Sequence, residues 1–150
     1  MQSIALQLES IINQHMPALK AIPENEMMDK PSPSKWSKKE ILGHVIDSAQ
    51  NNIRRFIVGQ YEEHPFIKYN QDEWVAISNY QNYDLSELIT LWVSINKHLC
   101  VILKNTSSQN QQREVMTNEL HTISWLAADY NKHLLHHLHQ ILDMEPVAYP

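Results

Sequence analysis

The sequence is poor in the residues that disulfides and tight turns require. Among 150 residues there are 1 cysteine and 2 glycines. A single cysteine, Cys100, excludes an intrachain disulfide. Its neighbours Leu99, Val101 and Ile102 are apolar, so we interpret Cys100 as a core residue and not as a nucleophile. The shortage of glycine argues against a sheet protein with many tight turns.

Positive charge and long apolar segments are also scarce. The formal net charge is −5 and no run of basic residues occurs, which argues against a nucleic-acid partner. We find no apolar stretch near the roughly 20 residues that a membrane span requires. Residues 1–20 lack the charged start and apolar block of a signal peptide. We therefore expect a cytoplasmic protein with neither nucleic-acid nor membrane partners. A small molecule is the expected substrate.

Apolar residues recur at helical spacing, which predicts an all-α protein. The expected long helices cover residues 3–19, 37–58, 85–104 and 122–144. An irregular segment with a short helix near residues 71–77 separates the second from the third, and an extended tail follows the last. Four such helices in a chain of this length predict a four-helix bundle forming a single domain over residues 1–150.

Polar residues mark where these helices begin and end. Ser37 and Glu40 have the spacing of a capping box, in which each side chain satisfies a free N–H of the first turn. Asp84 and Thr122 are expected to cap the third and fourth long helices. Gly59 is expected to end the helix that Ser37 begins.

The segment NKHLLHHLHQI, residues 131–141, has four histidines between positions 133 and 139. A helix turns by about 100° per residue, so His133 and His137 lie about 40° apart on one face. Two imidazoles at this spacing can bind one metal ion. A solvated polar face that happens to use histidine is the alternative, and the spacing alone favours neither. We interpret His136 and His139 as surface residues or as residues around the ligands.

A divalent metal site with an open position needs a third protein ligand. The histidine candidates are His15, His44, His64, His98 and His121. On the expected helix 37–58, the side chains within about 60° of the direction of His44 are polar; they are Glu40, Asp47, Ser48, Asn51 and Arg55. Such a stripe is usually the wet face of a helix, so it is compatible with a polar pocket without requiring one. Asp129 and Gln140 lie near the direction of His133, where either could hydrogen-bond a ligand imidazole or a bound water.

Three segments of the chain resemble the DinB-like family of four-helix metalloproteins. Residues 35–57, KWSKKEILGHVIDSAQNNIRRFI, resemble the second-helix motif of that family, with Trp-Ser before the helix, then His44 and Asp47-Ser48. Residues 125–141, WLAADYNKHLLHHLHQI, resemble its last-helix motif, an aromatic residue followed by H-x-x-H-H-x-x-x-I. Residues 69–99 are similar to the subgroup that contains the bacillithiol S-transferases. The resemblance covers about residues 31–141.

This resemblance implies a bundle of up-down-down-up topology with long connections. It also implies a metal triad of His44, His133 and His137. The ion implied is Zn²⁺ or Ni²⁺, although three imidazoles suit Cu and Fe as well. A homodimer is the expected assembly.

The activity implied is a thiol S-transferase in which the ion activates a low-molecular-weight thiol. Asp47 and Gln140 are then candidate catalytic residues. Ser48, Asn51 and Arg55 are candidate substrate contacts, with Arg55 pairing with a carboxylate of the thiol. For each of these five residues the alternative is a solvated surface side chain. A metal-dependent hydrolase would use the same triad, and a non-catalytic bundle that binds metal or a protein partner is the third alternative.

Overall fold

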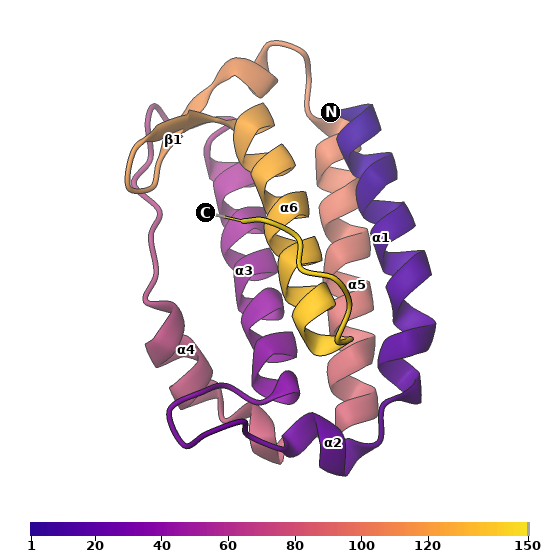
Figure 1. The fold of residues 1–150 in the computed structure, drawn as a ribbon. Coiled ribbons are helices and arrows are strands. Elements are labelled where there is room, and N and C mark those ends of the chain that lie inside the picture. The colour runs from indigo at the N-terminus through magenta and orange to yellow at the C-terminus, as the bar shows by residue number, and fades with distance from the viewer. Residues whose placement is uncertain (150) are drawn as a thin grey trace.

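The computed structural model describes residues 1–149, and four long helices form its body (Figure 1). These are α1 (Gln2–Ala21), α3 (Lys38–Val58), α5 (Leu85–Asn105) and α6 (Ile123–Ile141). The short elements that join them are α2 (Glu24–Met28), α4 (Gln71–Ser78), the 3-10 helices η1 (Tyr80–Asn82) and η2 (Asn110–Gln112), and strands β1 (Glu114–Met116) and β2 (Leu120–Thr122).

The long helices pack in the circular order α1, α5, α3, α6. Helices α1 and α6 run one way, and α3 and α5 run the other way (Figure 1). Contacts between helix ends agree with these directions, because Gln2 of α1 donates to the carbonyl of Lys104 of α5, and Lys38 of α3 pairs with Asp143 after α6. The predicted four-helix bundle with up-down-down-up topology is confirmed. Because α3 and α5 are parallel, the chain between them must return along the bundle, which explains the long connection.

The predicted helix starts are confirmed by their caps. The Ser37 hydroxyl accepts a hydrogen bond from the Glu40 amide at 3.1 Å, and the Glu40 carboxylate accepts one from the Ser37 amide at 2.7 Å. Asp84 and Thr122 cap α5 and α6 in the same position. Each cap satisfies an N–H that the first helical turn leaves free.

Other boundaries differ from the prediction. Helix α6 ends at Ile141 and not near residue 144, and Asp143 then adopts a left-handed conformation with φ of 52°. Helix α2 and the hairpin of β1 and β2 were not predicted. Elements of three to five residues are too short for a hydrophobic period to be recognised. Gly59 does end α3, but with φ of −60°. A Cβ atom there would lie 2.6 Å from Val115 Cγ2, so glycine is needed because β1 packs closely on it.

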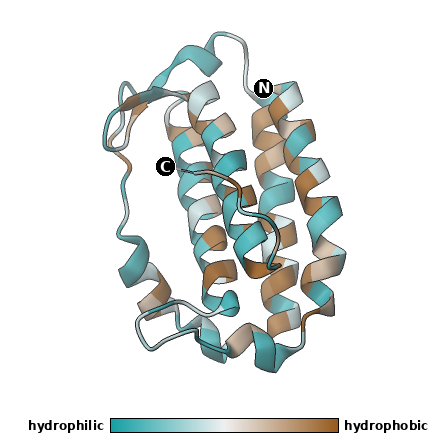
Figure 2. Cartoon of the chain, in the orientation of Figure 1, coloured by the Kyte–Doolittle hydropathy of each residue, from teal (hydrophilic) through white to brown (hydrophobic). Residues whose placement is uncertain are grey.

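The interior of the bundle is a continuous apolar cluster to which all four long helices contribute. Figure 2 shows hydrophobic and hydrophilic residues interspersed along each of these helices. The largest buried side chains of the cluster include Trp92, Tyr130 and Phe56. Cys100 is buried in this cluster, as predicted. Its thiol lies 3.7 Å from the backbone carbonyl of Ala5.

Helix α5 corrects one expectation about apolar segments. By length and composition it is apolar enough to cross a membrane, whereas we expected no such segment. Its residues Leu88, Trp92 and Leu99 are fully buried in the bundle, and so is the polar Asn96. Core helices of water-soluble bundles have the same length and composition, so α5 alone does not indicate a membrane span.

Candidate metal centre

Three imidazoles from two helices converge between α3 and α6. The Nε2 atom of His133 lies 3.2 Å from Nε2 of His44 and 3.1 Å from Nε2 of His137. Their candidate ligand atoms all lie within 4.8 Å of one another. Helical spacing places His133 and His137 on one face of α6, and antiparallel packing brings His44 of α3 opposite them. The structure thus brings together all three residues of the predicted triad.

The spacing of these nitrogen atoms fits a bound cation. With Zn–N bonds of about 2.0–2.1 Å, two nitrogen ligands of a tetrahedral ion lie about 3.3 Å apart. A neutral imidazole has one N–H, so Nε2 of His133 cannot donate a hydrogen bond to both neighbours. A cation bound by the lone pairs of all three Nε2 atoms would explain why they lie so close together without enough hydrogens to bond one another. Within residues 1–149, no second group of three potential ligands has this spacing.

Burial keeps the three imidazoles in the neutral form that binds metals. It lowers the pKa of His44 to about 3 and that of His133 to about 2, and neighbouring imidazoles add to both shifts. The pKa of His137 is also lowered by burial, against a hydrogen bond with Gln140 that raises it. The Trp36 ring covers His44, with ring centroids 5.0 Å apart. The apo site therefore offers neutral ligands without prior loss of protons.

The second ring nitrogens of the triad have different surroundings. The Oε1 atom of Gln140 lies 2.8 Å from Nδ1 of His137, and the hydroxyl of Ser48 lies 3.4 Å from Nδ1 of His133. Nδ1 of His44 is buried and forms no hydrogen bond with a described residue. Gln140 thus holds the ring of one candidate ligand, and Ser48 approaches another.

The polar stripe of α3 is buried, so the alternative of a solvated face is wrong for most of it. His44 and Asp47 are 1% exposed, and Ser48 and Asn51 are 5% exposed. The physical reason is that α3 contacts α5 and α6 on two sides and α4 and η1 on another. Buried polar groups of this kind need partners, and the partners distinguish their roles.

Asp47, Asn51 and Arg55 form their hydrogen bonds with groups other than the triad. Asp47 accepts a hydrogen bond of 2.5 Å from the Tyr80 hydroxyl, while Asn51 donates to the backbone carbonyl of Asp47 at 2.9 Å. Arg55 donates through Nε and Nη2 to the carbonyl of Ile67. The catalytic role of Asp47 and the substrate contacts of Asn51 and Arg55 stay predictions.

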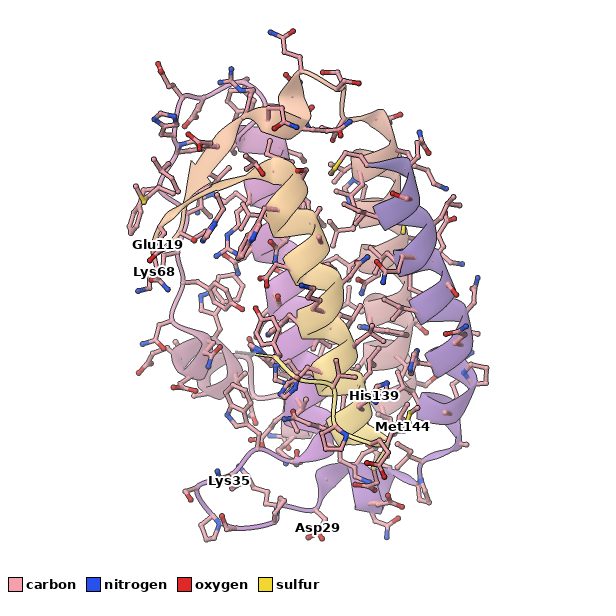
Figure 3. The ribbon with its side chains drawn as sticks, turned by 45° about the horizontal axis from the view of Figure 1, so that its top comes forward. Asp29, Lys35, Lys68, Glu119, His139 and Met144 are labelled. Atoms are coloured by element: carbon pink, nitrogen blue, oxygen red, sulfur yellow. The ribbon has the colours of Figure 1, made fainter. Side chains whose placement is uncertain are left out.

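Two cavities border the triad, one at His137 and the other at His133. The larger, of about 780 Å³, is lined by His137, Gln140 and Trp36 and by residues of the loop between α2 and α3. Asp29 and Lys35 of that loop also line this cavity, and Figure 3 labels both on the loop. The smaller, of about 120 Å³, is lined by Ser48, Arg55 and His133 and by three residues that sequence reasoning did not place at the site, Asn52, Tyr69 and Tyr149.

Tyr149 reaches the smaller cavity because the predicted extended tail folds back along α6 (Figure 1). Its hydroxyl donates a hydrogen bond of 2.9 Å to the Asp129 carboxylate, and its ring centroid lies 5.2 Å from that of His133. Asp129 therefore anchors the tail, whereas we had considered it as a partner of a ligand imidazole. No periodicity in the sequence indicates this contact, because a non-helical tail has none.

We expect Asp47→Asn to stabilise the metal-free protein at pH 7. Burial raises the pKa of the Asp47 carboxyl to about 6, against the hydrogen bond from Tyr80 that lowers it. The folded state therefore holds this proton more tightly than the unfolded chain does, and stability is expected to fall as the pH rises from about 3.8 to about 6. Asparagine keeps an oxygen acceptor for Tyr80 but carries no charge. The gain in unfolding free energy at pH 7 is expected to be on the order of 1 kcal/mol.

Urea unfolding at several pH values tests this prediction. The difference between Asp47→Asn and the unsubstituted protein should shrink as the pH falls from about 6 toward the ordinary value of 3.8, where Asp47 of the folded protein is protonated and carries no more charge than asparagine does. Glu62→Gln, which removes an exposed carboxylate, serves as the control. A difference that is the same at pH 7 and pH 4 would contradict the burial of an ionised Asp47.

The fold and the site define a class, a helical bundle in which three histidines from two helices form a candidate metal centre. A family model described as the DinB superfamily matches residues 7–141. The chain belongs to this superfamily, which confirms the resemblance in its motifs.

Two curated relatives carry the name "Putative metal-dependent hydrolase". OB0782 of Oceanobacillus iheyensis is 28% identical over 109 residues, which are 69% of this chain and 63% of the relative. YfiT of Bacillus subtilis is 24% identical over 113 residues, which are 73% of this chain and 64% of the relative. The match thus spans less than two thirds of the length of either relative.

Solved structures share the fold. YfiT from Bacillus subtilis, described as having an unusual four-helix bundle topology, superposes with a TM-score of 0.83 at 20% identity, over 94% of this chain and 83% of YfiT. A mycothiol-dependent maleylpyruvate isomerase superposes with a TM-score of 0.76 at 16% identity, over 97% of this chain and 61% of the isomerase. At these identities the likeness concerns the fold alone.

Proposed function

We propose that the protein is a metal-dependent S-transferase that uses a low-molecular-weight thiol. The observation that carries this proposal is the convergence of three Nε2 atoms beside a pocket of about 780 Å³. When bound, a divalent cation such as Zn²⁺ or Ni²⁺ lowers the pKa of a thiol or a water and so supplies a nucleophile near neutral pH. A pocket of this volume can hold a drug-sized organic molecule.

The residues of this chain have separate tasks in the proposal. His44, His133 and His137 hold the ion through Nε2, and Gln140 orients His137 by accepting from its Nδ1. The larger pocket receives the thiol and its electrophilic partner, with Trp36 as an apolar wall. Arg55 borders the smaller cavity beside His133 and forms no ion pair with a described residue. Its guanidinium already donates to the Ile67 carbonyl and to the Asn52 side chain, so a carboxylate of the substrate would bind through the remaining N–H groups.

The relatives support two chemistries at such a centre. The isomerase of known structure is named as dependent on mycothiol, which favours a thiol. The two curated relatives are named as metal-dependent hydrolases, which favours hydrolysis with the same triad as our second candidate. A bundle that binds metal without catalysis is the remaining alternative. A homodimer, a cytoplasmic location and a single domain over residues 1–150 stay predictions.

We expect turnover of an electrophile such as monochlorobimane only when the protein contains metal and a thiol is present. The experiment compares metal-loaded and EDTA-treated protein with a panel of biological thiols, and measures bimane fluorescence. The same protein is then incubated with esters and amides without thiol. Turnover of esters or amides alone would contradict the transferase proposal and favour the hydrolase. Stoichiometric metal with no turnover in either panel would favour the third alternative, a bundle that binds metal without catalysis.

A further inference from the structure

The four histidines of α6 divide into two pairs with different partners. His133 and His137 face His44, as described above. His136 and His139 instead hold the chain that follows the helix. Nδ1 of His136 lies 2.8 Å from the carbonyl oxygen of Val147, and Nδ1 of His139 lies 2.7 Å from that of Glu145. Figure 3 places His139 at the end of α6, near Met144, where the chain turns back.

One of these contacts connects with the metal centre through a chain of hydrogen bonds. Beyond the contact with Val147, Nε2 of His136 lies 2.9 Å from the side-chain nitrogen of Gln140. The side-chain oxygen of Gln140 lies 2.8 Å from Nδ1 of His137. Three consecutive contacts of ordinary hydrogen-bond length thus connect the tail backbone with a candidate ligand. We refer to Val147, His136, Gln140 and His137 as the relay.

The carbonyl at one end fixes the direction of the whole relay. The oxygen of Val147 can only accept, so Nδ1 of a neutral His136 carries the hydrogen and Nε2 becomes an acceptor. The amide nitrogen of Gln140 must then donate to that Nε2, which leaves its oxygen to accept from His137. The hydrogen of His137 is therefore on Nδ1, and its Nε2 presents a free lone pair. If the donors and acceptors of the relay were exchanged, Nδ1 of His136 would carry no hydrogen. Its lone pair would then face the carbonyl oxygen of Val147 at 2.8 Å, which is repulsive.

We propose that His136 and Gln140, ordered by the Val147 carbonyl, are positioning residues that hold His137 in the tautomer able to bind a metal through Nε2. The proposal rests on the proposed function in one respect, that His137 is a ligand. Which nitrogen of a histidine binds is set by the hydrogen bond that the other nitrogen makes. Without the relay, a hydrogen on Nε2 competes with the metal.

The tautomer of His137 can be measured in the metal-free protein by ¹⁵N NMR, because protonated and unprotonated ring nitrogens resonate far apart. In the full chain we expect His137 to carry its hydrogen on Nδ1. Gln140→Leu removes the acceptor and His136→Phe removes the middle of the relay, so both variants should shift His137 toward the other tautomer. Gln140→Glu keeps an oxygen acceptor and should restore the Nδ1–H form.

Metal affinity provides a second measurement. Loss of a residue that orients a ligand typically lowers affinity by about 10–100-fold, and we expect this loss of Zn²⁺ affinity in Gln140→Leu and His136→Phe but not in Gln140→Glu. His98→Ala, which removes an exposed histidine of α5, is the matched control and should bind as the unsubstituted chain does. Circular dichroism establishes that each variant is folded.

Two results would overturn the proposal. One is a His137 with its hydrogen on Nε2 in the unsubstituted metal-free chain. The other is an unchanged tautomer in Gln140→Leu. Neither depends on turnover or on bound metal, so failure of the proposed function, seen as absence of metal or of activity, is distinguishable from failure of the relay.

Discussion

Substituting alanine for His44 or His137 is expected to reduce bound metal from about one ion per chain to a small fraction of that. The physical reason is that the three Nε2 atoms form one site, with neighbouring pairs 3.1 and 3.2 Å apart. Removing one imidazole leaves two ligands, and the affinity should fall by more than the roughly 100-fold upper range typical for the loss of an orienting residue. Elemental analysis of protein purified without a metal-affinity tag measures this result.

The matched control for these variants is His98→Ala. It removes one imidazole from the same bundle but from an exposed position on α5, and it should retain the full metal content. Circular dichroism and thermal unfolding show whether each variant keeps the fold. If folded His44→Ala and His137→Ala both keep an undiminished metal content, the triad is refuted, and the proposed function with it.

The largest expected loss of stability comes from Gly43→Ala. A Cβ atom at this position would overlap the ring of Tyr80. That ring cannot move freely, because it is buried and its hydroxyl donates to Asp47, one turn further along α3. Overpacking a core typically costs about 1–3 kcal/mol, and we expect a loss near 3 kcal/mol in the unfolding free energy. For a chain of this length that corresponds to a fall in Tm of roughly 10 °C.

A double-mutant cycle identifies the cause. In a Tyr80→Ala background the space beside Gly43 is open, so Gly43→Ala should cost nothing or even stabilise α3 by up to about 1 kcal/mol through its higher helix propensity. Urea unfolding of the four proteins measures the coupling. An equal cost of Gly43→Ala in both backgrounds would show that the ring of Tyr80 is not what excludes a side chain there.

Local signals in the sequence were sufficient for the four long helices and for two of the three candidate metal ligands. Apolar spacing predicted the four long helices, and the caps at Ser37, Asp84 and Thr122 predicted where three of them begin. The spacing of His133 and His137 predicted that they share a face of α6. These signals are local because hydrogen bonds within a helix depend on residues only a few positions apart.

The family resemblance added what local signals could not. Periodicity did not select His44 from the other candidate histidines, because its stripe looked like a solvated face. The stripe is buried since other elements cover α3 on several sides, and one helix considered alone gives no sign of this. The DinB-like motifs indicated His44 as the third ligand and also indicated the bundle topology, neither of which depends on local periodicity.

By itself the sequence determined the four long helices, the caps of three of them and the histidine pair of α6, since each of these depends on residues within about one or two turns of one another. Only the tertiary structure decided that His44 meets this pair and that Asp47 faces Tyr80. It alone also decided that His136 and Gln140 connect the tail with His137. The contacts of His44 and of Asp47 join residues distant in sequence, and Val147 lies beyond the end of α6, so folding of the chain is what brings them within hydrogen-bond distance.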